Sequence, residues 1–499
     1  MTASAAPESL SIHLIAVGGS GMAPLACLLA EAGHRVRGSD GPLYPPMSTL
    51  LADCGIVPLV GYDAAHLDPA PDLVVVGNAV RRDNPEALEA ERRGLPVASM
   101  PETLARFFLA GRRPLVVAGT HGKTTTSAIA AWVLSDAGRN PGFLIGGLPR
   151  NFRRSFRAGG GDRFVVEGDE YNAAYFDRGP KFLHYRPETL ILTSVEYDHA
   201  DLYESPAALV TAYERLIDLV PPSGRLVAFG DSPEVREVVR RARCPVVLYG
   251  LAADNDLTIE GEIEPVAETA IPGRSGSRFR VRDPEAGVVP VVLPMVGRHN
   301  VTNALSVWAA ARADGVPADA VARALGRYAG VARRQDELGT AGGVTVVDDF
   351  AHHPTAVETT LHGLRHRYPG RRLIALFEPR SLTAGRAFFA DAYARSFRAA
   401  DRVLIAPVYY AGRFAAGDLL DREGLARALT AAGTPADPCA TVDDLLARAL
   451  DLARPGDVFV TMSSGAFGGV PHRLLAALGE RAEADGGAGH MSTGGTSVP

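Results

Sequence analysis

The sequence contains little lysine, little cysteine and no long apolar run. Lysine occurs only at Lys123 and Lys181, although the chain has 51 basic residues. A position that keeps lysine in so arginine-rich a chain is a candidate functional position. Four cysteines are spread along the chain: Cys27, Cys54, Cys244 and Cys439. Their spacing includes no CxxC pair, which predicts neither a disulfide framework nor a zinc site and fits a reducing cytoplasm.

Two further absences limit the partners. No stretch approaches the roughly 18 apolar residues of a membrane span, and the first residues, MTASAAPESL, lack the charged and apolar regions of a signal peptide. The 51 basic residues are outnumbered by 57 acidic residues, which leaves a net charge of −6 and no basic field for a nucleic acid. We therefore expect a cytoplasmic protein without membrane insertion and without a nucleic-acid partner. The sequence does not indicate an oligomeric state.

What the sequence does contain is typical of an α/β protein. The 499 residues correspond to about three domains, and short apolar runs, glycine-containing loops and helical stretches alternate along the chain. The predicted organisation is a Rossmann-like domain at 1–110, a central domain at 111–332, a second Rossmann-like domain at 333–481 and a tail at 482–499. The central domain is expected to combine a parallel sheet with a strand-rich part near 257–293. The tail is polar and rich in glycine, which predicts disorder.

The first glycine-rich turn, Gly18-Gly19-Ser20-Gly21, follows a predicted strand. Its glycines allow backbone N–H groups to approach a phosphate, and Asp40 closes the second predicted strand, where a ribose or base is often contacted. Because the GxGxxG pattern is incomplete, a purely structural turn is an equally good interpretation.

The strongest local signal follows the predicted strand at 114–118. It consists of Gly119, Thr120, His121, Gly122, Lys123, Thr124 and Thr125. In a phosphate-binding loop the glycine N–H groups surround an anion, the lysine reaches the β/γ-phosphates and the next hydroxyl binds Mg²⁺. A full Walker pattern would place glycine where Val117 stands, so a threonine-rich helix cap is the competing interpretation.

Acidic residues follow two other predicted strands. Glu167–Glu170 and Glu196–Asp201, which includes His199, are expected to meet the phosphate loop, because ligands collect at the carboxyl ends of parallel strands. Carboxylate oxygens suit Mg²⁺. The competing interpretation is that these are solvated turns.

Three other segments carry polar side chains that could bind a ligand. Asn300 and Asn303, near the start of a predicted helix at 301–313, could contact an adenine edge or cap the helix. Arg333 and its neighbour Arg334 could contact phosphates or be surface charge. The loop 348–354 contains two adjacent histidines, but adjacent residues seldom bind one ion, so a metal site there is disfavoured.

The motifs GTHGKTTT, HNVTN and DDFAHHPT, in this order over about residues 10–480, resemble the Mur ligase family. The resemblance implies three α/β domains and an ATP-dependent ligase that forms an amide bond on a UDP-N-acetylmuramoyl precursor of peptidoglycan. It implies activation of a carboxylate as an acyl phosphate, which the incoming amine then attacks. A phosphate-loop binding module without ligase activity is the alternative from another class.

Further motifs indicate a branch of this family. The GGSGM turn and the DDxxHHPT loop are similar to members that use UDP-N-acetylmuramate itself as acceptor. The segments 167–171, 181–187, 198–201, 377–381 and 462–469 are similar to members that attach the tripeptide L-alanyl-γ-D-glutamyl-meso-diaminopimelate, and members that attach L-alanine are the alternative. The chain departs from the family pattern at Ser194, Ser464 and Ala466.

The resemblance also implies roles for individual residues. Lys123, Glu167 and His199 would be catalytic, Thr124 and Glu167 would hold one Mg²⁺, and Glu167 with His199 a second. The remaining implied contacts are Gly119–Thr125, Asn300, Asn303, Arg333 and Asp349 for ATP; Gly18, Gly19, Ser20, Gly21 and Asp40 for the UDP-sugar; and His352, Arg380 and Ser381 for the peptide. Many relatives carry a carbamylated lysine at the metal site; no lysine follows Lys181 here, so Glu214 is a speculative substitute.

Overall fold

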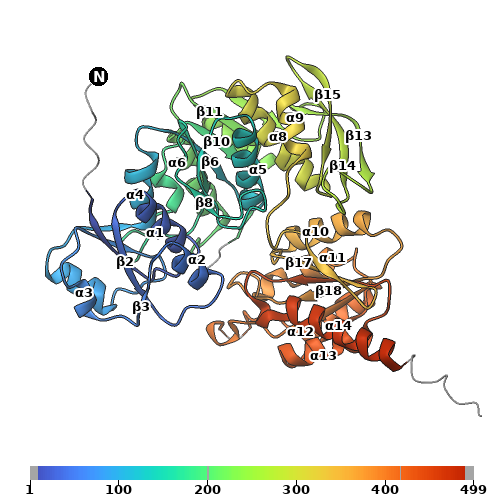
Figure 1. Ribbon diagram of the computed structural model, residues 1–499. Coiled ribbons are helices and arrows are strands. Elements are labelled where there is room, and N and C mark those ends of the chain that lie inside the picture. Colours follow the sequence, from blue (N-terminus) through green and yellow to red (C-terminus); the bar gives the residue numbers. More distant parts are fainter. Residues whose placement is uncertain (1–8, 199–201, 416, 489–499) are drawn as a thin grey trace, which may run out of the picture.

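The computed structural model describes residues 9–198, 202–415 and 417–488. Three sheets with mainly parallel strands follow one another along the chain, each with helices packed against it, and a small antiparallel sheet extends the middle region (Figure 1). This arrangement confirms the predicted three-domain α/β fold. No helix among the described residues is long and apolar enough to cross a membrane.

The N-terminal sheet has the strand order β3-β2-β1-β4-β5, and all its pairings are parallel. Its strands are β1 (Ser11–Ile15), β2 (Arg35–Asp40), β3 (Leu59–Val60), β4 (Leu73–Val76) and β5 (Val97–Ser99). Its helices are α1 (Met22–Glu31), α2 (Met47–Asp53), α3 (Pro85–Arg92) and α4 (Met100–Leu104). Because β1 is central, the glycine turn that follows it lies in the middle of the carboxyl edge of the sheet.

The central sheet has the order β12-β11-β10-β6-β9-β7-β8. Its strands are β6 (Arg113–Ala118), β7 (Gly142–Leu144), β8 (Phe156–Arg157), β9 (Arg163–Gly168), β10 (Thr189–Leu192), β11 (Arg225–Phe229) and β12 (Val246–Tyr249). The antiparallel sheet comprises β13 (Thr258–Val266), β14 (Gly276–Asp283) and β15 (Gly287–Leu293). The helices are α5 (Lys123–Asp136), α6 (Pro206–Asp218), α7 (Pro233–Val238), α8 (Arg298–Ala313) and α9 (Ala318–Gly326).

Helices α5 and α8 pack together over the central sheet. Both contribute apolar side chains, among them Ile129, Val133, Leu305 and Trp308, to one buried core. Helix α8 begins at Arg298, three residues before the predicted start. Asn303, in the second turn of α8, lies beside Gly122, where the phosphate loop ends and α5 begins.

The C-terminal sheet has the order β16-β17-β21-β18-β19-β20, with β16 antiparallel to its neighbour. Its strands are β16 (Asp336–Ala341), β17 (Val344–Asp349), β18 (Leu373–Phe377), β19 (Arg402–Ile405), β20 (Ala436–Pro438) and β21 (Val458–Met462). Its helices are α10 (Pro354–Arg367), α11 (Ala390–Ser396), α12 (Arg422–Ala431), α13 (Val442–Leu452) and α14 (Val470–Ala488). Helix α10 lies on the side that faces the central domain (Figure 1) and contacts α8.

The structure corrects two expectations. Helix α14 continues to Ala488, so residues 482–488 are helical and not part of a disordered tail; residues 489–499 lie outside the described part. Cys27 on α1 and Cys54 at the end of α2 form a disulfide, although their spacing predicted none. The packing of α1 against α2 brings these cysteines together, and sequence spacing does not report that packing.

A buried carboxylate links β1, β2 and α3 in the N-terminal domain. Glu86 accepts hydrogen bonds from the Ser39 hydroxyl at 2.5 Å and from Asp63 N–H at 3.2 Å, and it pairs with His13 at 2.9 Å and His66 at 2.8 Å. Burial raises the pKa of Glu86, but the hydrogen bonds from His13, Ser39 and His66 outweigh it, so the pKa lies below its ordinary value.

Replacing Glu86 by glutamine is expected to lower the unfolding free energy of the N-terminal domain by about 2 kcal/mol, the scale of a hydrogen bond to a buried charge. Because the folded-state pKa is lowered, this contribution is present above the ordinary pKa of 4.5 and declines as the pH falls below it. Hydrogen exchange of β1 and α3 amides at neutral and acidic pH measures the effect. Glu91→Gln, on the exposed side of the same helix, is the control. A pH-independent difference between Glu86→Gln and the unmodified protein would contradict the account.

Candidate functional site

The phosphate loop, Gly119–Thr124, connects β6 to α5 in a conformation that requires glycine at two positions. Gly119 has φ +129° and Gly122 has φ +79°. A Cβ at Gly119 would overlap the Thr193 hydroxyl, and one at Gly122 would lie 2.8 Å from Asn303 Oδ1. No side chain of the described residues caps α5, so its first N–H groups can receive an anion.

Lys123 places its charge at this loop. Its Nζ donates to the Gly119 carbonyl at 2.7 Å and to both carboxylate oxygens of Glu170, at 3.0 and 2.9 Å. Burial lowers the pKa of Lys123, but the charges of Glu170 and Asp169 outweigh it, so the pKa is raised and the amine is a cation at neutral pH. A phosphate that enters the loop would meet this cation together with the helix N-terminus.

Thr124 and Glu167 form a pair of oxygen ligands beside the lysine. The Thr124 hydroxyl donates to Glu167 Oε2 at 3.0 Å, and Gly146 N–H donates to Oε1 at 2.6 Å. Burial and the charge of Asp169 raise the pKa of Glu167 to about 7. A nearby cation would stabilise the charged form of this buried carboxylate. A hydroxyl oxygen together with a carboxylate oxygen is the kind of ligand set that Mg²⁺ prefers. His199, predicted to join this site, lies outside the described residues.

A cavity of about 360 Å³ opens beside the phosphate loop, between the central and C-terminal domains. Phe229, Tyr249, Leu251 and Met295 supply an apolar part of its wall. The polar part comes from both domains and includes His121, Thr125, Asn300, Asn303, Arg334, Gln335, Asp349 and Thr355. An apolar cavity with a few polar groups at one end is typical of a small-molecule site.

Both predicted asparagines line this cavity. Asn300 uses its side-chain N–H to hold the Val296 carbonyl at 2.8 Å, which is a structural contact, whereas Asn303 faces Gly122 of the phosphate loop. Asp349 of the C-terminal domain also lines the cavity and accepts hydrogen bonds from Gln335 N–H at 2.6 Å and Ala351 N–H at 2.8 Å. Burial raises the pKa of Asp349.

Arg333 and Arg334 make different contacts. Arg333, the predicted phosphate ligand, donates to Asp348 at 3.1 Å and to the carbonyls of Ser463 at 2.9 Å and Gly465 at 2.6 Å. Arg334 lines the cavity and lies 3.4 Å from the Thr124 hydroxyl. The structure therefore directs Arg334 toward the phosphate loop and uses Arg333 to join two segments of the C-terminal domain.

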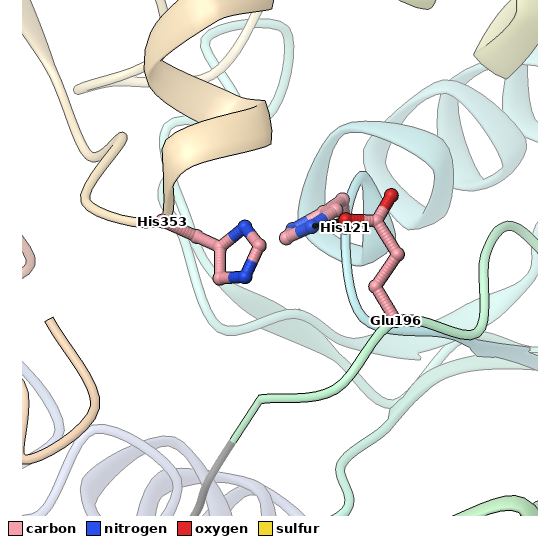
Figure 2. Close-up of side chains that lie close together, drawn as sticks. All are labelled: His121, Glu196 and His353. Atoms are coloured by element: carbon pink, nitrogen blue, oxygen red, sulfur yellow. Dashed lines mark hydrogen bonds and ion pairs between the residues drawn. The ribbon is translucent and has the colours of Figure 1, made fainter. Parts of the chain in front are cut away.

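Three side chains converge where the phosphate loop meets the C-terminal domain (Figure 2). His121 Nε2 lies 3.3 Å from Glu196 Oε2, which also accepts a hydrogen bond from the Thr355 hydroxyl at 2.7 Å. The His353 ring stands 4.7 Å from the His121 ring, centroid to centroid. The sequence shows only His352 and His353 as an adjacent pair; the cluster depends on how the domains meet and carries no sequence signal.

The glycine turn of the N-terminal domain is closed by the predicted aspartate. Asp40 accepts hydrogen bonds from Gly18 N–H at 2.8 Å and Gly41 N–H at 2.7 Å, and from the Tyr62 hydroxyl at 3.1 Å. Burial and the neighbouring Asp40 charge raise the pKa of Tyr62 to about 12, so it stays a hydrogen-bond donor. Asp40 thus orders the turn that Gly19, Ser20 and Gly21 continue.

The predicted peptide-binding residues lie at the carboxyl edge of the C-terminal sheet. The Arg380 guanidinium stands 3.8 Å from the centre of the Tyr409 ring and 3.6 Å from Glu378, and it packs against Gly465. Ser381 accepts a hydrogen bond from Ala384 N–H at 2.8 Å, and His352 Nδ1 lies 3.0 Å from the Phe350 carbonyl oxygen. The segments 377–381 and 463–465, distant in sequence, therefore meet.

Comparison with known proteins identifies the family. Three family models match the chain: the Mur ligase family catalytic domain at residues 11–112, the Mur ligase middle domain at 117–311 and the Mur ligase glutamate ligase domain at 333–465. The chain belongs to the Mur ligase family. Members of this family are ATP-dependent ligases, so the phosphate loop and the cavity beside it belong to an enzyme that consumes ATP.

Individual relatives match this Mur ligase over nearly its whole length. It is 40% identical to the UDP-N-acetylmuramate–L-alanyl-γ-D-glutamyl-meso-2,6-diaminoheptandioate ligase of Escherichia coli, over 95% of this chain and 100% of the relative. It is 37% identical to the UDP-N-acetylmuramate–L-alanine ligase of Variovorax paradoxus, over 93% and 94%. The crystal structure of a murein peptide ligase from Psychrobacter arcticus is 35% identical, with a TM-score of 0.70, and the match covers 94% of this chain and 99% of that one.

Some residues that line the cavity could not be predicted from the sequence. The apolar cavity wall, with Phe229, Tyr249 and Leu251, comes from the ends of β11 and β12, which carried no motif. Glu214, considered as a substitute for a carbamylated lysine, is partly exposed on α6 and interacts electrostatically with Arg241. This position gives it no described contact with Glu167.

Replacing Gly122 by alanine is expected to weaken binding of an ATP analogue by about tenfold or more, equivalent to about 1.4 kcal/mol. The added Cβ would press on Asn303 and strain a backbone with positive φ. Isothermal titration calorimetry measures the affinity. Gly138→Ala is the matched control, because Gly138 has φ +75° at the other end of α5 with open space around it. Equal losses in both variants would contradict a role for the Gly122–Asn303 approach.

Proposed function

We propose that this Mur ligase joins the tripeptide L-alanyl-γ-D-glutamyl-meso-diaminopimelate to UDP-N-acetylmuramate, with ATP and Mg²⁺. The observation that carries the ATP-dependent step is the Thr124–Glu167 pair beside Lys123 at the N-terminus of α5. The choice of substrates is supported by the full-length similarity to ligases named for this tripeptide and by the contact between segments 377–381 and 463–465.

The chemical problem is that a carboxylate is a poor acyl donor. Transfer of the ATP γ-phosphoryl group to the lactyl carboxylate of UDP-N-acetylmuramate releases ADP and makes an acyl phosphate, from which phosphate can leave in the next step. The peptide amine attacks the acyl carbon, and collapse of the tetrahedral intermediate forms the amide and expels phosphate. The protein contributes mainly positioning and neutralisation of charge.

In this proposal Lys123 and the N–H groups of Gly119–Thr125 hold the β/γ-phosphates, and Lys123 moves from Glu170 toward the phosphate oxygens. Arg334, which lines the cavity, adds a second cation at the Thr124 side, a role the sequence assigned to Arg333. Asn300, Asn303 and Asp349 lie where they can orient the adenosine part. The apolar wall at Phe229 and Tyr249 accommodates the base.

Thr124 and Glu167 would hold Mg²⁺, with His199 as a ligand of a second ion. An ion held there would supply positive charge next to the phosphate oxygens. The raised pKa of Glu167 fits this role, because no cation of the described residues contacts the buried carboxylate directly. Glu167 is also held in orientation by Gly146 N–H, which leaves the Thr124 side open to the phosphate loop.

The other two substrates occupy the flanking domains. Gly18–Gly21 and Asp40 would bind the UDP part, while His352, Arg380 and Ser381 would bind the tripeptide. The three sites lie on three domains, so ligation needs the domains to close on the substrates. We place the reaction in the cytoplasm, where ATP and UDP-sugars are available.

A comparison of the two amine substrates, the tripeptide and L-alanine, tests the proposed specificity. With UDP-N-acetylmuramate and Mg-ATP, the tripeptide is expected to support phosphate release at least tenfold faster than L-alanine at equal subsaturating concentrations, because only the tripeptide can reach all C-terminal contacts. Phosphate release and mass spectrometry of the product measure the outcome. Preference for L-alanine would assign the alternative ligase activity, and ATP hydrolysis indifferent to both muramoyl and amine substrates would indicate a binding module.

A further inference from the structure

The cluster of His121, Glu196 and His353 is built from three separate segments. His121 belongs to the phosphate loop, Glu196 follows β10, and His353 is the N-cap residue of α10 in the C-terminal domain. One potential ligand atom from each side chain lies within 4.8 Å of the other two (Figure 2). It is the one such group of three found among the described residues.

The backbone holds two of these residues in place. His121 N–H donates to the Ser194 hydroxyl at 2.9 Å, and its carbonyl accepts a hydrogen bond from Thr193 at 2.5 Å. Glu196 N–H donates to the Thr120 hydroxyl at 2.9 Å, and that hydroxyl donates to the Glu196 carbonyl at 2.9 Å. Both side chains therefore start from fixed positions, as a preorganised site requires.

A second observation points to a ligand. His353 is only 7% exposed, and its Nε2 is buried without a hydrogen-bond partner among the described residues. Its Nδ1 accepts a long hydrogen bond, 3.3 Å, from Thr355 N–H. A buried ring nitrogen without a partner costs free energy, which a bound ion would recover. Nδ1 is on the His121 side of the ring (Figure 2), so coordination at Nε2 requires the ring to turn; it then places the ring proton on Nδ1 and gives up the long contact with Thr355.

The donor set defines the class of ion. Two imidazoles and one carboxylate are the protein ligands of many zinc sites that keep a fourth position open, and borderline divalent ions prefer nitrogen in this way. Mg²⁺ prefers an all-oxygen environment, which is the chemistry of Thr124 and Glu167. In tetrahedral zinc sites the ligand atoms lie roughly 3.4 Å apart, given bonds of about 2.1 Å. The His121–Glu196 distance of 3.3 Å already matches, and a rotation of His353 would complete the set.

We propose that His121, Glu196 and His353 bind one zinc-class divalent ion, at a site separate from the Mg²⁺ site. The ion ties the phosphate loop to the first turn of α10 and so joins the central and C-terminal domains. Thr355 supports the site by holding Glu196 Oε2 at 2.7 Å. The proposal does not depend on which amine the ligase uses, because His121 and Glu196 are placed by contacts within the protein itself.

The test uses the full-length chain freed of metal with a chelator and kept in excess Mg²⁺ to saturate oxygen sites. Zn²⁺ is titrated in competition with a chromophoric chelator, and Co²⁺ is added separately to record visible absorption of nitrogen-ligated cobalt. We expect one high-affinity ion per chain and a cobalt spectrum. His353→Asn is expected to weaken Zn²⁺ binding at least tenfold and to remove the cobalt spectrum, because each ligand contributes strongly to affinity.

The asparagine variant is chosen to preserve the fold, since asparagine is a favourable N-cap residue and can still accept the Thr355 N–H. Glu196→Gln is a second variant that changes a partly exposed side chain. His362→Asn, on the exposed side of α10, is the matched control and is expected to retain full affinity. Circular dichroism checks folding in each variant.

Two results would overturn the proposal. Failure of the unmodified chain to bind Zn²⁺ at stoichiometric concentration would mean that the cluster is only a hydrogen-bonded contact between domains. Equal Zn²⁺ affinity in the unmodified chain, His353→Asn and Glu196→Gln would place any bound zinc elsewhere.

Discussion

The interaction on which the site depends is the burial of one lysine among carboxylates at the carboxyl edge of the central sheet. Lys123 balances Glu170 directly and lowers the cost of keeping Asp169 and Glu167 nearby. Removing either Lys123 or Glu170 would leave the other charge buried without a partner, which costs free energy in a medium of low dielectric constant. The ion pair also keeps the Lys123 amine charged beside the N-terminus of α5, where a phosphate could replace Glu170 as its partner.

The surrounding architecture serves this charge balance. Parallel pairing of β6 with β9 and β10 brings the phosphate loop, Glu167 and Glu196 to one edge. Packing of α8 on α5 adds Asn303 to the cavity lining, and the C-terminal domain adds Arg334 and Asp349. The cavity is therefore formed where the two domains meet.

Local sequence signals predicted the parts that depend on local physics. The run Leu73–Val76 forms β4 as expected, and the glycines of the phosphate loop adopt the positive φ that makes glycine necessary. The different contacts of Arg333 with Asp348 and of Arg334 with Thr124 could not be predicted, because they depend on how the chain folds between the two domains. The cluster of His121, Glu196 and His353, the Cys27–Cys54 disulfide and the cavity wall likewise depend on helix or domain packing.

The most direct test of the account removes the central cation. Lys123→Ala is predicted to abolish ATP-dependent ligation, with a loss of about a thousandfold or more in kcat/KM, because charge neutralisation at the transferred phosphoryl group is lost. Binding of UDP-N-acetylmuramate, measured in parallel by calorimetry, is predicted to persist, since the N-terminal domain keeps its glycine turn and Asp40. Ligation by the variant at a rate close to that of the unmodified protein would contradict the account.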